Sequence, residues 1–569
     1  MELKEKIKMA RGEAEPDIVL KNAKIVNVFS GTIHDADVAI CEDTIVGVGE
    51  YDARRVIDLN GRFVSPGFLD SHVHIESSMV TPSEYARAVV PQGTTSVVID
   101  PHEIANVAGK AGIKYMIDSS ENSPLDVYVM VPSCVPATTM ETSGASLTAD
   151  DIIEFKKEKR VLGLAEMMNF PGVVNQFPEV LEKIEKWKDK IIDGHAPGLS
   201  GKDLAAYIIS GIRSDHECTT VEEAREKIEM GMMVMIREGT AAKNLGTLLP
   251  LVRAENASRF CFCTDDRHPY DLMVQGHINY LIKRAVAMGL DPITAIKMAT
   301  INPALYFGLT DRGAVAVGYR ADLVVFDNFE NMNISLVFKN GNIVAENGML
   351  KQEPQKITPE GLLKSIIKDP VDSRSLKVEY IEKSMMRVIQ IIPDQIITKQ
   401  IAVTPNVVDG YVESSTEEDI LKIVVVERYG KSGNINTGFV KGFGLKKGAI
   451  GSSVAHDSHN IIAVGTNDSD IRDVINSIVK MQGGLAAVVD GKVRDSLPLP
   501  VGGLMSEEPL NYVKDRLEGL KKITREMGCT IGDPFMQLSF TALPVIPELK
   551  ITDMGLVDVN NFRFVSLFI

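Results

Sequence analysis

Short apolar runs alternate with helix-like stretches through the middle of the chain. Between about residues 67 and 310, eight runs of strand length are each followed by sequence that favours a helix. Eight such units predict a (β/α)8 TIM barrel, whose functional groups lie at the carboxyl ends of its strands. The expected strands are 63–72, 95–99, 127–131, 161–165, 191–193, 211–213, 233–236 and 260–263.

The flanks of this central part show short strands separated by turns, without long helices. Neither flank is long enough to form a stable sandwich alone. We therefore predict one small β-sandwich domain built from residues 1–66 and 311–358, with the barrel at 67–310 inserted into it. The expected strands are 18–20, 24–28, 38–40, 45–48, 313–315, 321–326 and 337–344, the last with a hairpin turn at Asn340-Gly341.

The pattern changes again after about residue 358. Strands such as 387–392 and 422–426 are combined with helices that include 508–527, and turn-rich stretches lie at 442–451 and 498–504. This mixture predicts a separate C-terminal α+β domain over residues 359–569. The fold class expected for the whole chain is α/β: a metal-dependent barrel, a split β domain and a C-terminal α+β domain.

Composition narrows the classes of partner and compartment. The chain has 569 residues, with 61 basic and 77 acidic side chains and a net charge of −16, which argues against nucleic acid or an anionic membrane as the main partner. No apolar stretch approaches the roughly 20 residues of a membrane span. The six cysteines form no C-x-x-C pair, and the first residues are charged. We expect a cytoplasmic protein with reduced thiols.

The most distinctive polar motif is the pair His72 and His74 at the end of the first barrel strand. In an extended strand, residues two apart point to the same face at roughly 6.6 Å, so two imidazoles can bind one ion. A lone pair of this kind is also common on surfaces. Four further candidates each follow a separate apolar run, in agreement with the barrel rule: Glu166, His195, His216 and Asp265.

The order of these six residues resembles the amidohydrolase superfamily, in which a split β domain flanks the barrel. Within it, residues 66–78, 100–107, 163–169 and 263–269 are similar to the adenine deaminases of bacteria and archaea. The resemblance covers nearly the whole chain. It implies hydrolytic removal of the 6-amino group of adenine, giving hypoxanthine and ammonia in purine salvage, and it implies Mn²⁺ or Fe²⁺ as the metal.

The chemistry of the six candidates agrees with two ions. Four imidazoles and two carboxylates are too many for one tetrahedral site but suit two divalent ions about 3.5–4 Å apart that share a carboxylate. We assign His72, His74 and Asp265 to one ion, His195 and His216 to the other, and Glu166 to the bridge. These ligands permit Mn²⁺, Fe²⁺ or Zn²⁺, and affinity alone does not choose among them.

The expected nucleophile is a water activated by the two ions, which attacks C6 of adenine. Asp265 would take its proton and deliver it to the leaving amine. A ring nitrogen must also gain a proton, and the acid for this step stays open. Glu103, His102 and Glu76 are the alternatives, each also a candidate substrate contact.

Two further substrate contacts are Arg237 and Asp266, although Arg237 could equally form a structural ion pair. In the C-terminal domain, His456 and His459 lie on a loop before an expected strand. We expect this loop to close over the barrel and to lend polar groups, or a weaker third metal site, to the entrance. The alternative is a solvated loop on a domain that assists folding or oligomerisation.

The expected partners are adenine and water, and we expect a homo-oligomer. The nearest alternative function is another amidohydrolase reaction, such as hydrolysis of a cyclic amide or an N-acetyl amino sugar, on the same barrel. A non-enzymatic scaffold is disfavoured because every ligand position is filled. The unrelated zinc deaminases need a P-C-x-x-C motif, which this sequence lacks.

Overall fold

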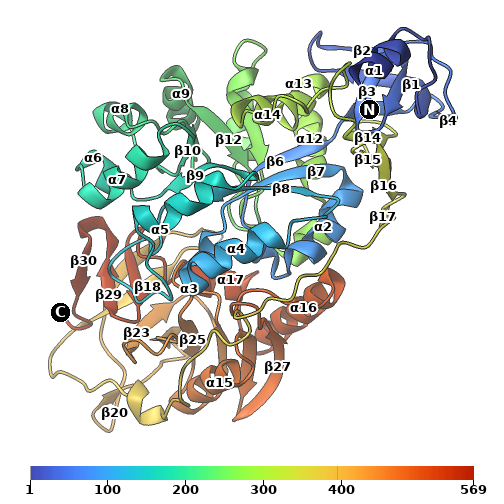
Figure 1. Cartoon of the computed structure of the whole chain (residues 1–569). Coiled ribbons are helices and arrows are strands. Elements are labelled where there is room, and N and C mark those ends of the chain that lie inside the picture. Colours follow the sequence, from blue (N-terminus) through green and yellow to red (C-terminus); the bar gives the residue numbers. More distant parts are fainter. Residues whose placement is uncertain (1, 394) are drawn as a thin grey trace.

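The computed structural model describes residues 2–393 and 395–569 and places a barrel of parallel strands at the centre of the molecule (Figure 1). Five strands form one parallel sheet in the order β10-β9-β8-β7-β6, and three form another in the order β11-β12-β13. Their bounds are β6 Phe68–Val73, β7 Thr94–Ile99, β8 Asp126–Val131, β9 Val161–Met167, β10 Ile191–Gly194, β11 Ser214–Asp215, β12 Met233–Arg237 and β13 Phe260–Cys263.

Backbone contacts join these two sheets on both sides, so the eight strands close on themselves. On one side the backbone N–H of Asp265 donates to the carbonyl of His72 at 2.9 Å, and on the other Arg213 donates to Ile192 at 3.2 Å. The predicted α/β barrel fold is thus confirmed. The sixth strand begins at Ser214, three residues later than predicted.

Helices between the strands pack apolar faces on the barrel. In α7, for example, Val180, Ile184 and Trp187 are buried at helical spacing while the glutamates between them are exposed. The helices of this region are α2 Pro82–Val89, α3 His102–Ala108, α4 Lys110–Asp118, α5 Ala149–Ile153, α6 Phe170–Val174, α7 Pro178–Trp187, α8 Gly201–Ile209, α9 Val221–Glu229, α10 Leu245–Leu248, α11 Pro269–Val274, α12 Ile278–Ala287, α13 Pro292–Met298 and α14 Ile301–Tyr306.

Strands from both flanks of the barrel form one nine-stranded sheet, as the sequence predicts for the small β domain. Its main path is β17-β16-β15-β14-β5-β1-β2-β3, with β4 beside β1, and the short helix α1 (Leu3–Ala10) contacts β3. The bounds are β1 Ile18–Asn27, β2 Thr32–Cys41, β3 Thr44–Val48, β4 Arg55–Asp58, β5 Phe63–Pro66, β14 Leu323–Phe326, β15 Ile334–Lys339, β16 Asn342–Glu346 and β17 Met349–Leu350.

Three details of these strands differ from the prediction. The runs 18–20 and 24–28 belong to one strand, β1, with a register shift between Leu20 and Ala23. The run 313–315 is buried but is not a strand. The run 63–72 is divided at Gly67, because β5 pairs in the small sheet and β6 in the barrel. A Cβ at Gly67 would collide with the side chain of Thr95, so this crossing point requires glycine.

The C-terminal domain is built on an eight-stranded sheet in the order β19-β18-β23-β22-β25-β24-β26-β27. A three-stranded antiparallel sheet, β28-β29-β30, follows it. The strand bounds are β18 Met386–Ile391, β19 Thr398–Val403, β20 Val407–Val408, β21 Tyr411–Val412, β22 Ile420–Val426, β23 Ile435–Lys441, β24 Ala449–Ser452, β25 Ile461–Gly465, β26 Gly484–Val489, β27 Lys492–Pro498, β28 Leu549–Thr552, β29 Gly555–Asp558 and β30 Arg563–Val565; the helices are α15 Asp468–Lys480, α16 Leu510–Glu526 and α17 Pro534–Phe540.

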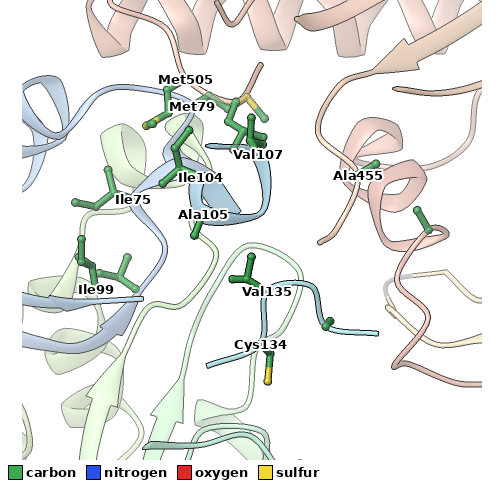
Figure 2. Close-up of a cluster of buried hydrophobic side chains, with 14 of the residues drawn as sticks. Ile75, Met79, Ile99, Ile104, Ala105, Val107, Cys134, Val135, Ala455 and Met505 are labelled. Atoms are coloured by element: carbon green, nitrogen blue, oxygen red, sulfur yellow. The ribbon is translucent and has the colours of Figure 1, made fainter. Parts of the chain in front are cut away.

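The C-terminal domain docks on the barrel through backbone and apolar contacts. The backbone N–H of Ser506 donates to Met79 at 2.8 Å. Ile104 and Val107 of α3 belong to the same buried cluster as Met505 of the C-terminal domain (Figure 2). The two domains pack closely at this point: a Cβ at Gly502 would collide with the side chain of Ile104.

Among the described residues, no helix has the length and apolar character needed to cross a membrane.

Candidate metal centre and its pocket

The first candidate ligands meet at the carboxyl end of β6. The Nε2 atoms of His72 and His74 lie 3.2 Å apart, and both side chains are buried. Asp265, which follows β13, places its Oδ1 atom 3.5 Å from His72 Nε2 and 3.0 Å from His74 Nε2. The buried carboxylate of Asp70 accepts the backbone N–H groups of His72 and Thr264, which ties the ends of β6 and β13 together.

Glu166, at the end of β9, lies between two groups of ligands. Its Oε1 atom is 3.7 Å from His72 Nε2 and 3.5 Å from His74 Nε2. Its Oε2 atom is 2.6 Å from His195 Nδ1 and 3.2 Å from His216 Nε2. The two carboxylate oxygens therefore face different histidine pairs. A carboxylate that joins two metal sites has this arrangement.

The chemistry of these donors fits divalent cations. The Nδ1 atom of His74 lies 2.9 Å from the carbonyl oxygen of Asp100, so Nδ1 carries the proton and the Nε2 lone pair faces Asp265 and Glu166. Several sets of three such groups have ligand atoms within 4.8 Å of one another, among them His72, His74 and Glu166. Imidazole and carboxylate ligands without thiolate suit Mn²⁺, Fe²⁺ or Zn²⁺.

The electrostatics of the cluster also favour a positive charge. Burial lowers the pKa of His216, but Glu166 outweighs that effect and raises the pKa to about 9. Burial raises the pKa of Glu166, but His216 and His195 hold it well below the usual range. Without a metal, the imidazoles beside these carboxylates would therefore hold protons. Bound cations would take the place of those protons.

Arg237, at the end of β12, forms ion pairs inside the pocket. It donates to Asp265 Oδ2 at 2.7 Å and to Glu217 Oε2 at 2.9 Å. Burial raises the pKa of Asp265, but Arg237 and the two histidines of β6 hold it well below the usual range. Arg237 therefore keeps Asp265 ionised and leaves its Oδ1 atom facing His72 and His74.

Barrel loops and the C-terminal domain enclose one pocket over this cluster. The pocket has a volume of about 550 Å³, including its open mouth. Most of the predicted site residues line it: His74, His102, Glu103, Glu166, His195, His216, Arg237, Asp265, Asp266 and His456. The C-terminal domain adds Asp457 and the apolar side chains Ile396, Phe540, Leu543 and Ile546.

Two predicted residues occupy different places. Glu76 is absent from the described lining of this pocket and lines a smaller neighbouring cavity, where its Oε1 atom accepts the backbone N–H of Ile104 at 3.2 Å. Burial raises the pKa of Glu76 to about 7. His459 is fully buried behind the lining, next to Glu103.

Comparisons with known proteins agree with this architecture. The amidohydrolase family model matches residues 63–344, and the model of the adenine deaminase C-terminal domain matches residues 395–563. An adenine deaminase of Desulfatibacillum aliphaticivorans is 52% identical over 566 residues, which is 99% of each chain. Adenine deaminase 2 of Carboxydothermus hydrogenoformans is 50% identical, also over 99% of each chain.

The chain belongs to the adenine deaminase family. A solved structure described as an adenine deaminase is 19% identical, with a TM-score of 0.46, and covers 58% of this chain and 100% of that chain. Amidohydrolases are metal-dependent, and the clusters of histidines and carboxylates described above are where this family member could hold metal.

Sequence reasoning missed several residues of this pocket. Glu217 directly follows His216, but no local pattern in the sequence connects it with its ion-pair partner Arg237. Asp457 lies beside His456, which was singled out, and its carboxylate lies 3.9 Å from His102 Nε2. Nothing in the sequence marks Ile396, Leu543 and Ile546 as residues of a pocket wall, because leucine and isoleucine are equally typical of a buried core.

Proposed function

We propose that this protein catalyses the hydrolytic deamination of adenine to hypoxanthine and ammonia, a reaction of purine salvage, at a binuclear metal site. The observation that supports it best is the position of Glu166, whose two oxygens face two histidine pairs in a chain 52% identical to an adenine deaminase. His72, His74 and Asp265 would hold one ion, His195 and His216 the other, and Glu166 both. Two divalent cations there would supply the Lewis acidity that makes water nucleophilic near neutral pH.

Asp265 is the base in this proposal. Its Oδ2 atom is held by Arg237, so its Oδ1 atom stays directed at the cluster, where it accepts the proton of the attacking water. The same carboxyl group then delivers that proton to the leaving amine. Arg237 acts by orienting Asp265 and keeping it ionised, not by binding the purine.

Substrate binding is assigned to the lining of the pocket. Glu103, His102 and Asp266 carry polar groups that can contact the purine edge. Burial lowers the pKa of His102, but Asp100 outweighs that effect and raises it, so His102 serves the ring nitrogen that gains a proton. Phe540, Leu543 and Ile546 provide an apolar wall for a flat, uncharged base. A base bound against this wall would shield the reacting atoms from water.

The remaining assignments concern metal, assembly and location. We propose Mn²⁺ or Fe²⁺ as the resident metal, with Zn²⁺ as a substitute. We further propose a homo-oligomer located in the cytoplasm. The net charge of −16 and the absence of C-x-x-C pairs favour a soluble protein in a reducing compartment. Light scattering of the purified holoenzyme would measure the assembly.

Ultraviolet-monitored turnover tests the reaction directly. Protein stripped of metal and reconstituted with Mn²⁺, Fe²⁺ or Zn²⁺ should convert adenine to hypoxanthine, and should leave adenosine, guanine and cytosine unchanged. Metal analysis should approach two ions per chain. Failure to convert adenine with any of the three metals, together with hydrolysis of a cyclic amide or an N-acetyl amino sugar, would replace this proposal with the alternative reaction.

A further inference from the structure

Glu103 of the barrel is held by two histidines that belong to the C-terminal domain. His456 Nδ1 lies 2.7 Å from Glu103 Oε1, and His459 Nε2 forms an ion-pair contact with Glu103 Oε2. More than 350 residues separate Glu103 from these partners in sequence. All three side chains are buried, and Glu103 and His456 line the pocket over the candidate metal centre. The two histidines of the C-terminal domain thus contact different oxygens of the Glu103 carboxylate.

The proton on His459 can be assigned from its surroundings. The backbone N–H of Ala455 donates to His459 Nδ1 at 3.2 Å, so Nδ1 carries no proton. In the neutral ring the proton must then lie on Nε2, which faces Glu103. Burial lowers the pKa of His459 to about 4, in agreement with a neutral ring. The Nε2–H of His459 therefore faces Glu103 Oε2 and is in contact with it. A metal ligand would need a free lone pair on Nε2, so this cluster does not suit a third metal ion.

His456 has a complementary role on the other oxygen. Burial lowers its pKa, but Glu103 outweighs that effect and raises it to about 9. Its ring is stacked on Phe540, with centroids 4.6 Å apart and an interplanar angle of 16°. Its backbone N–H donates to Ser539 Oγ at 3.2 Å. Contacts with α17 therefore fix the position from which His456 reaches Glu103.

The loop that carries both histidines is also attached to the barrel. Ser458 Oγ donates to Glu141 at 2.7 Å, and Asn460 Nδ2 donates to the carbonyl of Thr142 at 2.9 Å. His102 also approaches Glu103: its Nε2 atom lies 3.6 Å from Glu103 Oε1, and its Nδ1 atom lies 3.4 Å from Glu166. A continuous polar path therefore leads from the C-terminal domain to the candidate metal centre.

We propose that His456 and His459 are positioning residues for the deaminase reaction: they orient the Glu103 carboxylate in the substrate pocket, so that the C-terminal domain completes the active site. This inference rests on the proposed function, because Glu103 is assigned there to the purine. In this proposal the two histidines hold Glu103 by ion-pair contacts instead of forming the expected third metal site with it. Misplacing a reacting or orienting group by about 1 Å can cost about 10²-fold in rate.

The test compares His459→Leu with the parent holoenzyme in one adenine assay. The variant should keep two metal ions per chain and its melting temperature, yet lose about 10- to 100-fold in kcat/KM. His459→Gln, which retains an N–H donor, should recover part of that loss. His34→Leu, the same substitution at an exposed position of β2, should stay within about twofold of the parent.

A double-variant cycle with Glu103→Gln separates positioning from a general structural role. If His459 acts through Glu103, adding His459→Leu to Glu103→Gln should lower kcat/KM no further than about twofold. Full multiplication of the two losses would overturn the proposal. Unchanged kcat/KM in His459→Leu, or a third metal equivalent that this variant loses, would do the same.

If His459→Leu fails to fold, a second variant tests the same proposal. His456→Phe keeps an aromatic ring on Phe540 and removes the contact with Glu103, so the same kinetic loss and the same cycle are expected. If the parent enzyme did not turn over adenine, the proposed function would be contradicted. Failure of the proposed function can therefore be distinguished from failure of the positioning role of His456 and His459.

Discussion

The barrel rim and the loop 454–460 of the C-terminal domain both supply polar groups to one pocket, but they are built differently. On the rim, the six candidate ligands lie at or directly after the carboxyl ends of five strands, β6, β9, β10, β11 and β13, and parallel backbone pairing with neighbouring strands holds them. On the loop, His456, Asp457 and His459 lie within four residues of irregular backbone. Their positions depend on contacts with α17 and with the barrel. The strand order of the barrel therefore sets the positions of the rim residues, whereas contacts between the two domains set the positions of the loop residues.

The two regions also differ in charge balance. On the rim, histidines and carboxylates converge with their lone pairs on common points, an arrangement that a cation stabilises. Around Glu103, one carboxylate is matched by one neutral histidine and one histidine whose pKa is raised to about 9, so the protein itself balances the charge. We therefore expect metal content to depend on the rim and the rate of reaction to depend on both.

The largest effect should come from the carboxylate between the histidine pairs. Glu166→Gln should release at least one of two metal ions and lower kcat/KM by about 10³-fold or more, because it removes an anionic ligand from a buried site. Metal analysis and adenine turnover measure both effects. Glu179→Gln, an exposed change on α7, is the matched control. Retention of both ions with full activity would remove Glu166 from the bridge.

A smaller loss is expected when the proposed base is neutralised. Asp265→Asn should lower kcat at least about 10²-fold with a much smaller change in KM, because it removes the proton acceptor and keeps the size of the side chain. Steady-state kinetics on adenine separate the two parameters. Cys263→Ala on the same strand should be milder. Near-parental turnover by Asp265→Asn would assign the proton transfer to Asp266 or Glu103.

The apolar wall of the C-terminal domain should affect binding more than chemistry. Leu543→Ala removes about three methyl or methylene groups from the pocket, so KM for adenine should rise about 10-fold while kcat stays within about threefold. Val493→Ala, at an exposed position of β27, should change neither parameter. A fall in kcat with constant KM would give the wall a catalytic role. The wall would then affect the chemical step, as the residues of the rim do.

The smallest expected effect is on stability. Lys550 is buried and donates to the carbonyls of Ile396 and Phe540, two residues of the pocket lining, and burial lowers its pKa to about 7. Between pH 7 and about 10.4 the unfolded chain therefore binds a proton that the folded chain does not, so this lysine makes stability rise with pH.

Lys550→Met should remove that part of the pH dependence. Urea unfolding at pH 7.5, 8.5 and 9.5 should show a flatter dependence of the unfolding free energy in the variant than in the parent. Lys480→Met, at an exposed position in the last turn of α15, should keep the parental slope. Equal slopes in all three proteins would mean that Lys550 keeps its proton in the folded state.

Much of the fold follows from local patterns in the sequence. Alternation of apolar runs with helical stretches predicts the barrel, and Asn340-Gly341 forms a two-residue connection between β15 and β16, with positive φ at both residues. The errors have local causes that periodicity does not reveal. Gly67 moves the chain from one sheet to another within an unbroken apolar run, and the register shift in β1 divides one strand into two apparent ones.

The sequence by itself determined which residues stand at the ends of the barrel strands. Parallel strands in a closed barrel must end at one rim, so the order of His72, His74, Glu166, His195, His216 and Asp265 already implied that they meet. Only the tertiary structure decided the pairing of Arg237 with Asp265, the apolar wall and the contacts of Glu103 with His456 and His459. The Arg237–Asp265 pair joins the ends of neighbouring barrel strands only 28 residues apart. The apolar wall and the Glu103 contacts join segments hundreds of residues apart through the docking of two domains. Neither strand nor helix periodicity records that docking, because each reports only the local burial of its own element.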